Sequence, residues 1–209
     1  MSSLFNSNMR KNGGWKKDEE CCQNYFKKKI TKIIWKSCPL TNDIITLLSE
    51  RVRHDINQFF GFTGSCIIPD NLTHDFIEVH IECENEECKN KSKKICYCCT
   101  FEYGSDGTSK EVGRYENWFE DRKSFVPKNF RYNYLLTIFS KYEKIFLAKD
   151  YDFLNHNCKT FASAFYSELE EMDAHFQSQF DKFESQCESK EAKELVKNLR
   201  EINADCLIY

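Results

Sequence analysis

The chain has 209 residues, 41% of them apolar and 15% aromatic, so it can bury a core and form one or two domains. Because 30 basic residues nearly balance 33 acidic ones, the net charge is -3, and no overall positive field favours nucleic acid as a partner. The 18 Phe and the scarcity of Gly and Pro exclude disordered and collagen-like classes.

Residues 1–40 are mostly polar and are expected to form an arm with a short apolar segment. They lack the apolar core and cleavage site of a signal peptide, and no apolar stretch reaches the ~20 residues of a transmembrane helix. We therefore expect a cytoplasmic protein with mostly reduced cysteines. The 12 cysteines would then serve in packing, metal binding or catalysis.

A single folded domain is expected over residues 41–166, beginning with an amphipathic helix over 41–60. Thr41 is a suitable N-cap for this helix, apolar residues recur at helical spacing, and Gly61 supplies the stop.

Two short segments rich in β-forming residues follow, at 76–81 and 95–103, and they are expected to pair as strands. Residues 104–107 have turn chemistry. The segment 118–127 is expected to be a loop that covers the core.

A second helix is predicted from about residue 130 to 148, where apolar residues form one stripe. Asn155 and Asn157 are good helix caps, which places Cys158 in the first turn of a further helix. Residues 167–209 keep a helical period within a very charged background, and they are expected to form a helical extension.

Cys158 is the strongest candidate nucleophile, because a helix N-terminus stabilises a thiolate. A cysteine nucleophile also needs a base, for which imidazole is the usual choice. His74 and His80 lie on one face of the first predicted strand, and either could reach a helix packed on the sheet.

The order of these residues resembles the circularly permuted papain-like superfamily, which includes the lecithin:retinol acyltransferase-like proteins and the PPPDE peptidases. The likeness covers about residues 72–166. It consists of a strand-opening His74, an aromatic-Glu-Tyr-Gly segment at 101–104, and Tyr151 followed by Asn-Cys-x-x-Phe at 157–161.

The resemblance implies an α+β fold, in which a small antiparallel sheet packs against the helix that carries the nucleophile. It also implies Cys158 as nucleophile and His74 as base. Asn157 could orient the imidazole or hold an oxyanion, although capping explains it better. Glu78 and Glu102 could orient His74, although solvent-facing glutamates are the simpler interpretation.

Three functions follow as expectations. The first is a cysteine-dependent hydrolase, a thiol peptidase or isopeptidase that acts on protein substrates. The second is an acyltransferase or thioesterase for lipid or lipidated substrates, which is weakened because no second histidine follows on the next strand. The third is a non-catalytic, cysteine-rich domain that binds a protein partner.

The catalysis expected here requires no cofactor, but a structural zinc ion is a further hypothesis. Cys83, Cys88, Cys96 and Cys98 are close in sequence and could surround zinc in a hairpin. Their spacing departs from the usual two Cys-x2–4-Cys pairs, so strand thiols that simply pack remain the alternative.

The last four residues, 206–209, have the Cys-aliphatic-aliphatic-X form of a prenylation signal. A prenylated Cys206 would attach the chain only weakly to a membrane, because one lipid without a basic cluster is a weak anchor. The alternative is a helix end that packs on the core.

Overall fold

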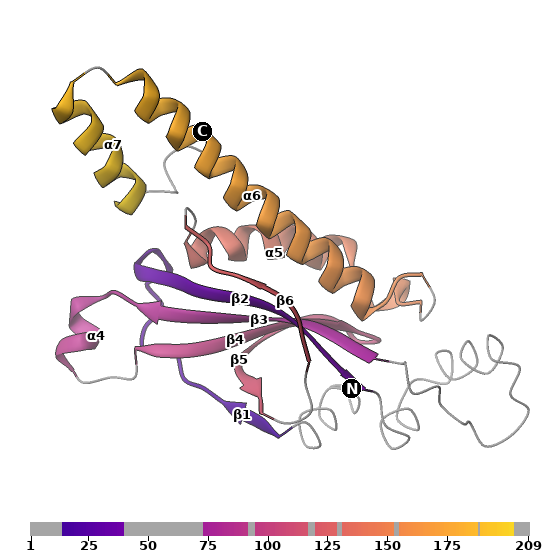
Figure 1. Cartoon of the computed structure of the whole chain (residues 1–209). Helices are drawn as coiled ribbons and strands as arrows, with labels where there is room; N and C mark the ends of the chain where they lie inside the picture. Colours follow the sequence, from indigo (N-terminus) through magenta and orange to yellow (C-terminus); the bar gives the residue numbers. More distant parts are fainter. Residues whose placement is uncertain are drawn as a thin grey trace, which may run out of the picture.

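The computed structural model describes residues 14–39, 73–91, 95–116, 120–128, 131–152, 155–187 and 189–202. Within these ranges the chain is an α+β protein with one six-stranded antiparallel sheet and four α-helices (Figure 1). The expected helix over 41–60 and the prenylation motif lie outside the described residues. No helix among the described residues is long and apolar enough to cross a membrane.

The sheet has the spatial order β1-β5-β4-β3-β2-β6. Its strands are β1 (Trp15–Lys17), β2 (Lys28–Pro39), β3 (Thr73–Cys83), β4 (Cys96–Gly104), β5 (Gly107–Tyr115) and β6 (Glu120–Phe125). The α-helices are α4 (Glu86–Asn90), α5 (Tyr132–Ile145), α6 (Cys158–Gln186) and α7 (Lys190–Ile202), and the 3-10 turns are η1 (Tyr25–Lys27) and η2 (Ala148–Asp150).

The N-terminal region differs from the expected polar arm, because residues 28–39 form the long strand β2. β2 lies between β3 and β6 inside the sheet. Its side chains Ile30, Ile33 and Trp35 are buried in the core. The four lysines of this segment make it look polar in sequence, although the apolar residues between them suffice for a strand that packs against the core.

The predicted strand pair is present as β3 and β4, in a register that places Val79 opposite Cys99. A tight hairpin then joins β4 to β5, and Gly107 adopts a positive φ of 96° there. β5 was not expected from the sequence. The expected loop over 118–127 instead contains β6, which pairs with β2.

Helices α5 and α6 lie together on one face of the sheet (Figure 1). On β3, Ile77, Val79 and Ile81 face this layer, and aromatic residues such as Phe161 and Phe165 on α6 pack against it. Each such fully buried side chain contributes roughly 1.5–3 kcal/mol through removal from water. This layer fixes the start of α6 relative to the sheet.

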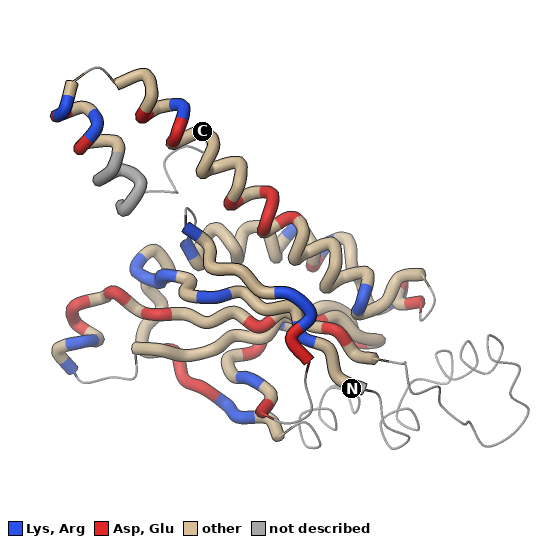
Figure 2. The backbone as a smooth tube through the Cα atoms, in the orientation of Figure 1, with Lys and Arg blue, Asp and Glu red and all other residues tan. Residues whose placement is uncertain are grey.

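The boundary expected between residues 166 and 167 falls inside α6, which continues without a break to Gln186. Phe176 and Phe180 remain buried along its second half, and α7 contributes the buried Val196. Acidic and basic residues alternate over this end of the molecule (Figure 2). The C-terminal region is therefore helical as predicted, but its first part belongs to the same helix as Cys158.

One lysine of β2 is fully buried, which is unusual for this residue type. The Lys28 ammonium lies 4.5 Å from the centroid of the Tyr25 ring and 5.1 Å from that of Tyr97, and it is 3.6 Å from a Glu20 carboxylate oxygen. The aromatic faces and the carboxylate replace the water that the cation has lost. This arrangement ties the segment before β2 to the sheet.

We expect Glu20→Ala to lower the free energy of unfolding by about 3 kcal/mol, because it leaves the Lys28 cation buried without its counter-charge. The double variant Glu20→Ala/Lys28→Met should regain most of that loss, because it removes the cation as well. Urea unfolding followed by circular dichroism measures both. If the free energy of unfolding of Glu20→Ala lies within ~0.5 kcal/mol of the parent value, Glu20 and Lys28 do not form a buried ion pair.

Candidate active site

Cys158 is the first residue of α6, as the sequence predicted. Asn157 caps the helix: its side-chain oxygen accepts hydrogen bonds from the backbone N–H groups of Lys159, at 3.0 Å, and Thr160, at 3.1 Å. The Thr160 hydroxyl in turn accepts from the Asn157 N–H at 2.8 Å, which completes a capping box. The cap fixes the position of Cys158 in the first turn.

These bonds use the side-chain oxygen of Asn157 for the helix cap, which is the interpretation that the sequence favoured over a catalytic one. The amides of Lys159 and Thr160 are engaged by the same cap. The cap thus accounts for the side-chain oxygen of Asn157 and for two amides of the first turn.

We expect Asn157→Ala to cost about 1 kcal/mol of stability, whereas Asn157→Ser should cost only a few tenths because serine also caps helices well. Chemical unfolding of the two variants measures the difference. Alkylation of Cys158 provides the second readout. An Asn157→Ser variant that is as stable as the parent but has lost Cys158 reactivity would assign Asn157 a direct role at the thiol.

His74 is the second residue of β3 and is fully buried. The Cys158 thiol lies 3.7 Å from the carbonyl oxygen of Thr73, so the start of α6 meets the start of β3. The thiol of Cys158 also raises the pKa of His74, so the two side chains are close enough to interact. The structure thus brings together the predicted nucleophile and the predicted base, 84 positions apart in the numbering of the chain.

Glu102 on β4 is the third member of this group. Its carboxylate lies 3.1 Å from Nε2 of His74. The β3–β4 register pairs Phe76 with Glu102, and residues two apart on a strand share a face, so Glu102 and His74 are diagonal neighbours. The Tyr115 hydroxyl donates to the same carboxylate at 3.2 Å.

The interpretation of Glu78 and Glu102 as solvent-facing residues is wrong, because both are buried. Glu78 pairs with Lys36 and with His80, at 3.0 and 2.7 Å, and not with His74. Only Glu102 of the two orients the imidazole of His74. No local pattern in the sequence distinguishes Glu102 from Glu78, because the choice depends on the strand register.

The charge balance of the group favours a protonated imidazole. Burial lowers the pKa of His74. Its interactions with Cys158 and with the Glu102 carboxylate raise the pKa by more than burial lowers it. The net result is a pKa well above the ordinary 6.5.

Two further side chains complete the surroundings. Tyr151 is buried close to Cys158, and burial together with the thiol's charge raises the pKa of its phenol well above 10.0. Cys38 is directly opposite His74 on β2, and burial raises the pKa of its thiol to about 11. Tyr151 belongs to the motif recognised in the sequence, but its proximity to Cys158 was not predicted. The position of Cys38 opposite His74 was not predicted either.

His80, the other candidate base, lies six residues further along β3. Hydrogen bonds with Cys98 and with Glu78 raise its pKa from 6.5 to about 9. His80 is thus held in a separate group. His156 is also separate, since its ring stacks on Phe146 with centroids 4.4 Å apart.

The raised pKa of His80 predicts a pH-dependent contribution to stability. Protonated His80 binds its partners in the folded state, so its contribution to stability is complete below about pH 6.5. The contribution is lost as the pH rises through about 9. The stability difference between the parent and His80→Gln should therefore be larger at about pH 6 than at about pH 10. Urea unfolding at both values measures it, and an equal difference at the two would contradict the prediction.

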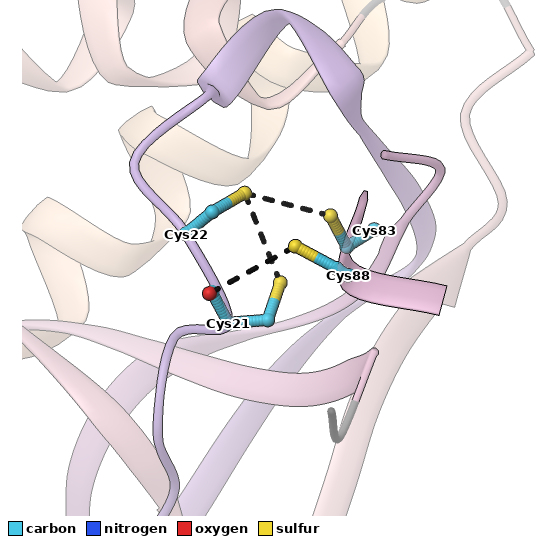
Figure 3. A group of neighbouring side chains, drawn as sticks. All are labelled: Cys21, Cys22, Cys83 and Cys88. Atoms are coloured by element: carbon cyan, nitrogen blue, oxygen red, sulfur yellow. Dashed lines mark hydrogen bonds between the residues drawn. The ribbon is translucent and has the colours of Figure 1, made fainter. Parts of the chain in front are cut away.

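The predicted cysteine set is only partly brought together. Cys83 and Cys88 lie close to each other, but Cys96 is exposed and Cys98 belongs to the group with Glu78 and His80. In place of Cys96 and Cys98, the thiols of Cys21 and Cys22 join the pair (Figure 3). The structure therefore corrects this hypothesis: these four cysteines, and not the predicted four, could hold a metal.

Comparison with protein-family models, curated proteins and solved structures gave no match to this chain. The chemistry of the site must therefore be judged from its own geometry. The site contains a thiol at a capped helix start, a buried imidazole next to it, and a buried carboxylate behind the imidazole. Groups in this order can serve as nucleophile, base and orienting group in acyl transfer.

Proposed function

We propose that the chain is a cysteine-dependent hydrolase in which Cys158 is the nucleophile, His74 the base and Glu102 the group that orients His74. The single observation behind this proposal is the grouping of three buried side chains: Cys158 interacts with His74, and His74 lies 3.1 Å from the carboxylate of Glu102. A purely structural thiol would need neither a charged partner nor a buried carboxylate behind that partner.

The residues supply each step of acyl hydrolysis. His74 takes the proton of Cys158, and the thiolate sulfur attacks the carbonyl carbon of the substrate. As the tetrahedral intermediate collapses, the bond to the leaving amine, alcohol or thiol breaks and His74 returns the proton to it. Water then attacks the resulting thioester with His74 as base, which releases the acid and restores the thiol.

Glu102 keeps the imidazole in one orientation and stabilises its positive charge, as a carboxylate does in other hydrolase triads. Tyr115 in turn holds Glu102. The backbone N–H of Cys158 is aimed by the helix start and would donate to the oxyanion. Tyr151, within hydrogen-bond reach of the sulfur, is placed to contact the same reacting group.

The architecture supports the permuted papain-like interpretation within this proposal. A nucleophile helix packed on an antiparallel sheet, with the histidine strand before the helix in sequence, is what that resemblance implies. Glu102 stands on the strand after His74, where acyltransferase-like proteins usually have a second histidine. We therefore propose peptide, isopeptide or thioester bonds of proteins as the substrate class, ahead of lipid acyl groups.

The test is alkylation of the parent with a small reagent at neutral pH, read for each cysteine by mass spectrometry. Cys158 should react faster than cysteines outside the site, and His74→Gln should slow it by roughly a hundredfold. Glu102→Gln should slow it less, because it removes only the orienting group. An acyl-thioester or peptide vinyl-sulfone probe should label Cys158 in the parent.

His80→Gln is the matched control, because it removes a histidine of the same strand that lies outside the group. It should leave both the alkylation rate and the probe labelling of Cys158 unchanged. Circular dichroism confirms that each variant is folded. If Cys158 reacts like the other cysteines, is insensitive to His74→Gln and resists the probes, the chain is not a cysteine hydrolase.

A further inference from the structure

Four cysteines from three separate segments meet at the end of the sheet opposite to His74. Cys21 and Cys22 precede η1, Cys83 is the last residue of β3, and Cys88 lies in the short helix α4. Their sulfur atoms all lie within 4.8 Å of one another, and the side chains point toward a common centre (Figure 3).

The sulfur spacing matches that around a tetrahedral zinc ion. A Zn–S bond of about 2.3 Å places the corners of the tetrahedron ~3.8 Å apart. Cys22 Sγ lies 3.7 Å from Cys83 Sγ and 3.9 Å from Cys21 Sγ. These separations are far longer than the ~2.05 Å of a disulfide. We propose that Cys21, Cys22, Cys83 and Cys88 together bind one structural Zn²⁺ ion.

Neighbouring groups donate hydrogen bonds to a sulfur of this cluster, as expected around metal-bound thiolates. The side-chain amide of Asn85 donates to Cys22 Sγ at 3.8 Å, and the backbone N–H of Asn24 lowers the pKa of the Cys22 thiol. Asn85 also caps α4 by accepting from the Glu87 N–H at 3.1 Å. Asn85 thus orients both α4, which carries Cys88, and the thiol of Cys22.

A small apolar core is the competing explanation, and the local composition argues against it. Among the residues that the structure describes, Ile95 is the only apolar side chain other than the cysteines that packs against the cluster. Between Cys83 and Ile95 the sole apolar residue is Cys88, and the rest are Glu, Asn, Lys and Ser. Such a segment buries too little apolar surface to hold itself in place, whereas zinc bonds supply that energy directly.

The site is structural and distinct from the candidate active site. Cys83 and His74 stand at opposite ends of β3, nine residues and so about 30 Å apart along the strand. Binding displaces the thiol protons to solvent and leaves Zn²⁺ with four thiolates, a closed set with no open position for a reacting water. The ion joins the segment before β2 to the β3–β4 connection.

The first measurement uses the full parent chain, purified under reducing conditions without chelator. Mass spectrometry of the elements should find about one zinc per chain, and X-ray absorption at the zinc edge should show four sulfur neighbours at about 2.3 Å. Removing zinc with a chelator should lower the melting temperature, and added Zn²⁺ should restore it. Co²⁺ added to the metal-free chain should give the visible spectrum of tetrahedral thiolate ligation.

Cys22→Ser/Cys83→Ser should lose the zinc, whereas the matched control Cys96→Ser, an exposed cysteine of the neighbouring strand, should keep it. Because the double variant can fail to fold, the zinc content and absorption spectrum of the parent carry the decision. A reduced parent chain without stoichiometric zinc and without the Co²⁺ spectrum overturns the proposal. The proposal is also overturned if these cysteines form disulfides in the freshly isolated chain, or if the double variant retains zinc.

Discussion

The contact between the first turn of α6 and the first residues of β3 is the constraint on which the rest of the site depends. The capping box of Asn157 and Thr160 defines where the helix begins, and the aromatic layer beneath α6 holds that end against the sheet. A helix that began one residue later would turn Cys158 by about 100° around the axis and away from His74. The cap and the core packing therefore act together to place the thiol.

β3 links the two ends of the molecule. Its first residues carry His74, its last residue is Cys83, and Ile77 and Val79 between them pack toward the helices. His74, Asp75 and Glu78 are buried along this strand, so each needs a partner, and Glu102, Arg122 and Lys36 respectively provide one. A buried polar network of this kind is costly unless it is complete, and it favours one strand register over its alternatives.

The N-terminal segment contributes more than its composition indicates. It supplies β2 inside the sheet, the buried ammonium of Lys28 and the thiols of Cys21 and Cys22. Its lysines serve the fold in two ways, because Lys28 is held among aromatic rings while Lys36 pairs with the buried Glu78. The proposed zinc ion would anchor this segment at the point where it meets the β3–β4 connection.

The sequence by itself determined the features that depend on neighbouring residues: helices α5 and α6, strands β3 and β4, and the position of Cys158 behind an Asn cap. Periodicity and capping are local, so they can be recognised without the fold. Only the tertiary structure decided that Glu102 stands behind His74 and that Cys21 and Cys22 join Cys83 and Cys88. These groupings arise from strand register and from contacts between segments about sixty residues apart, and no local pattern carries that information.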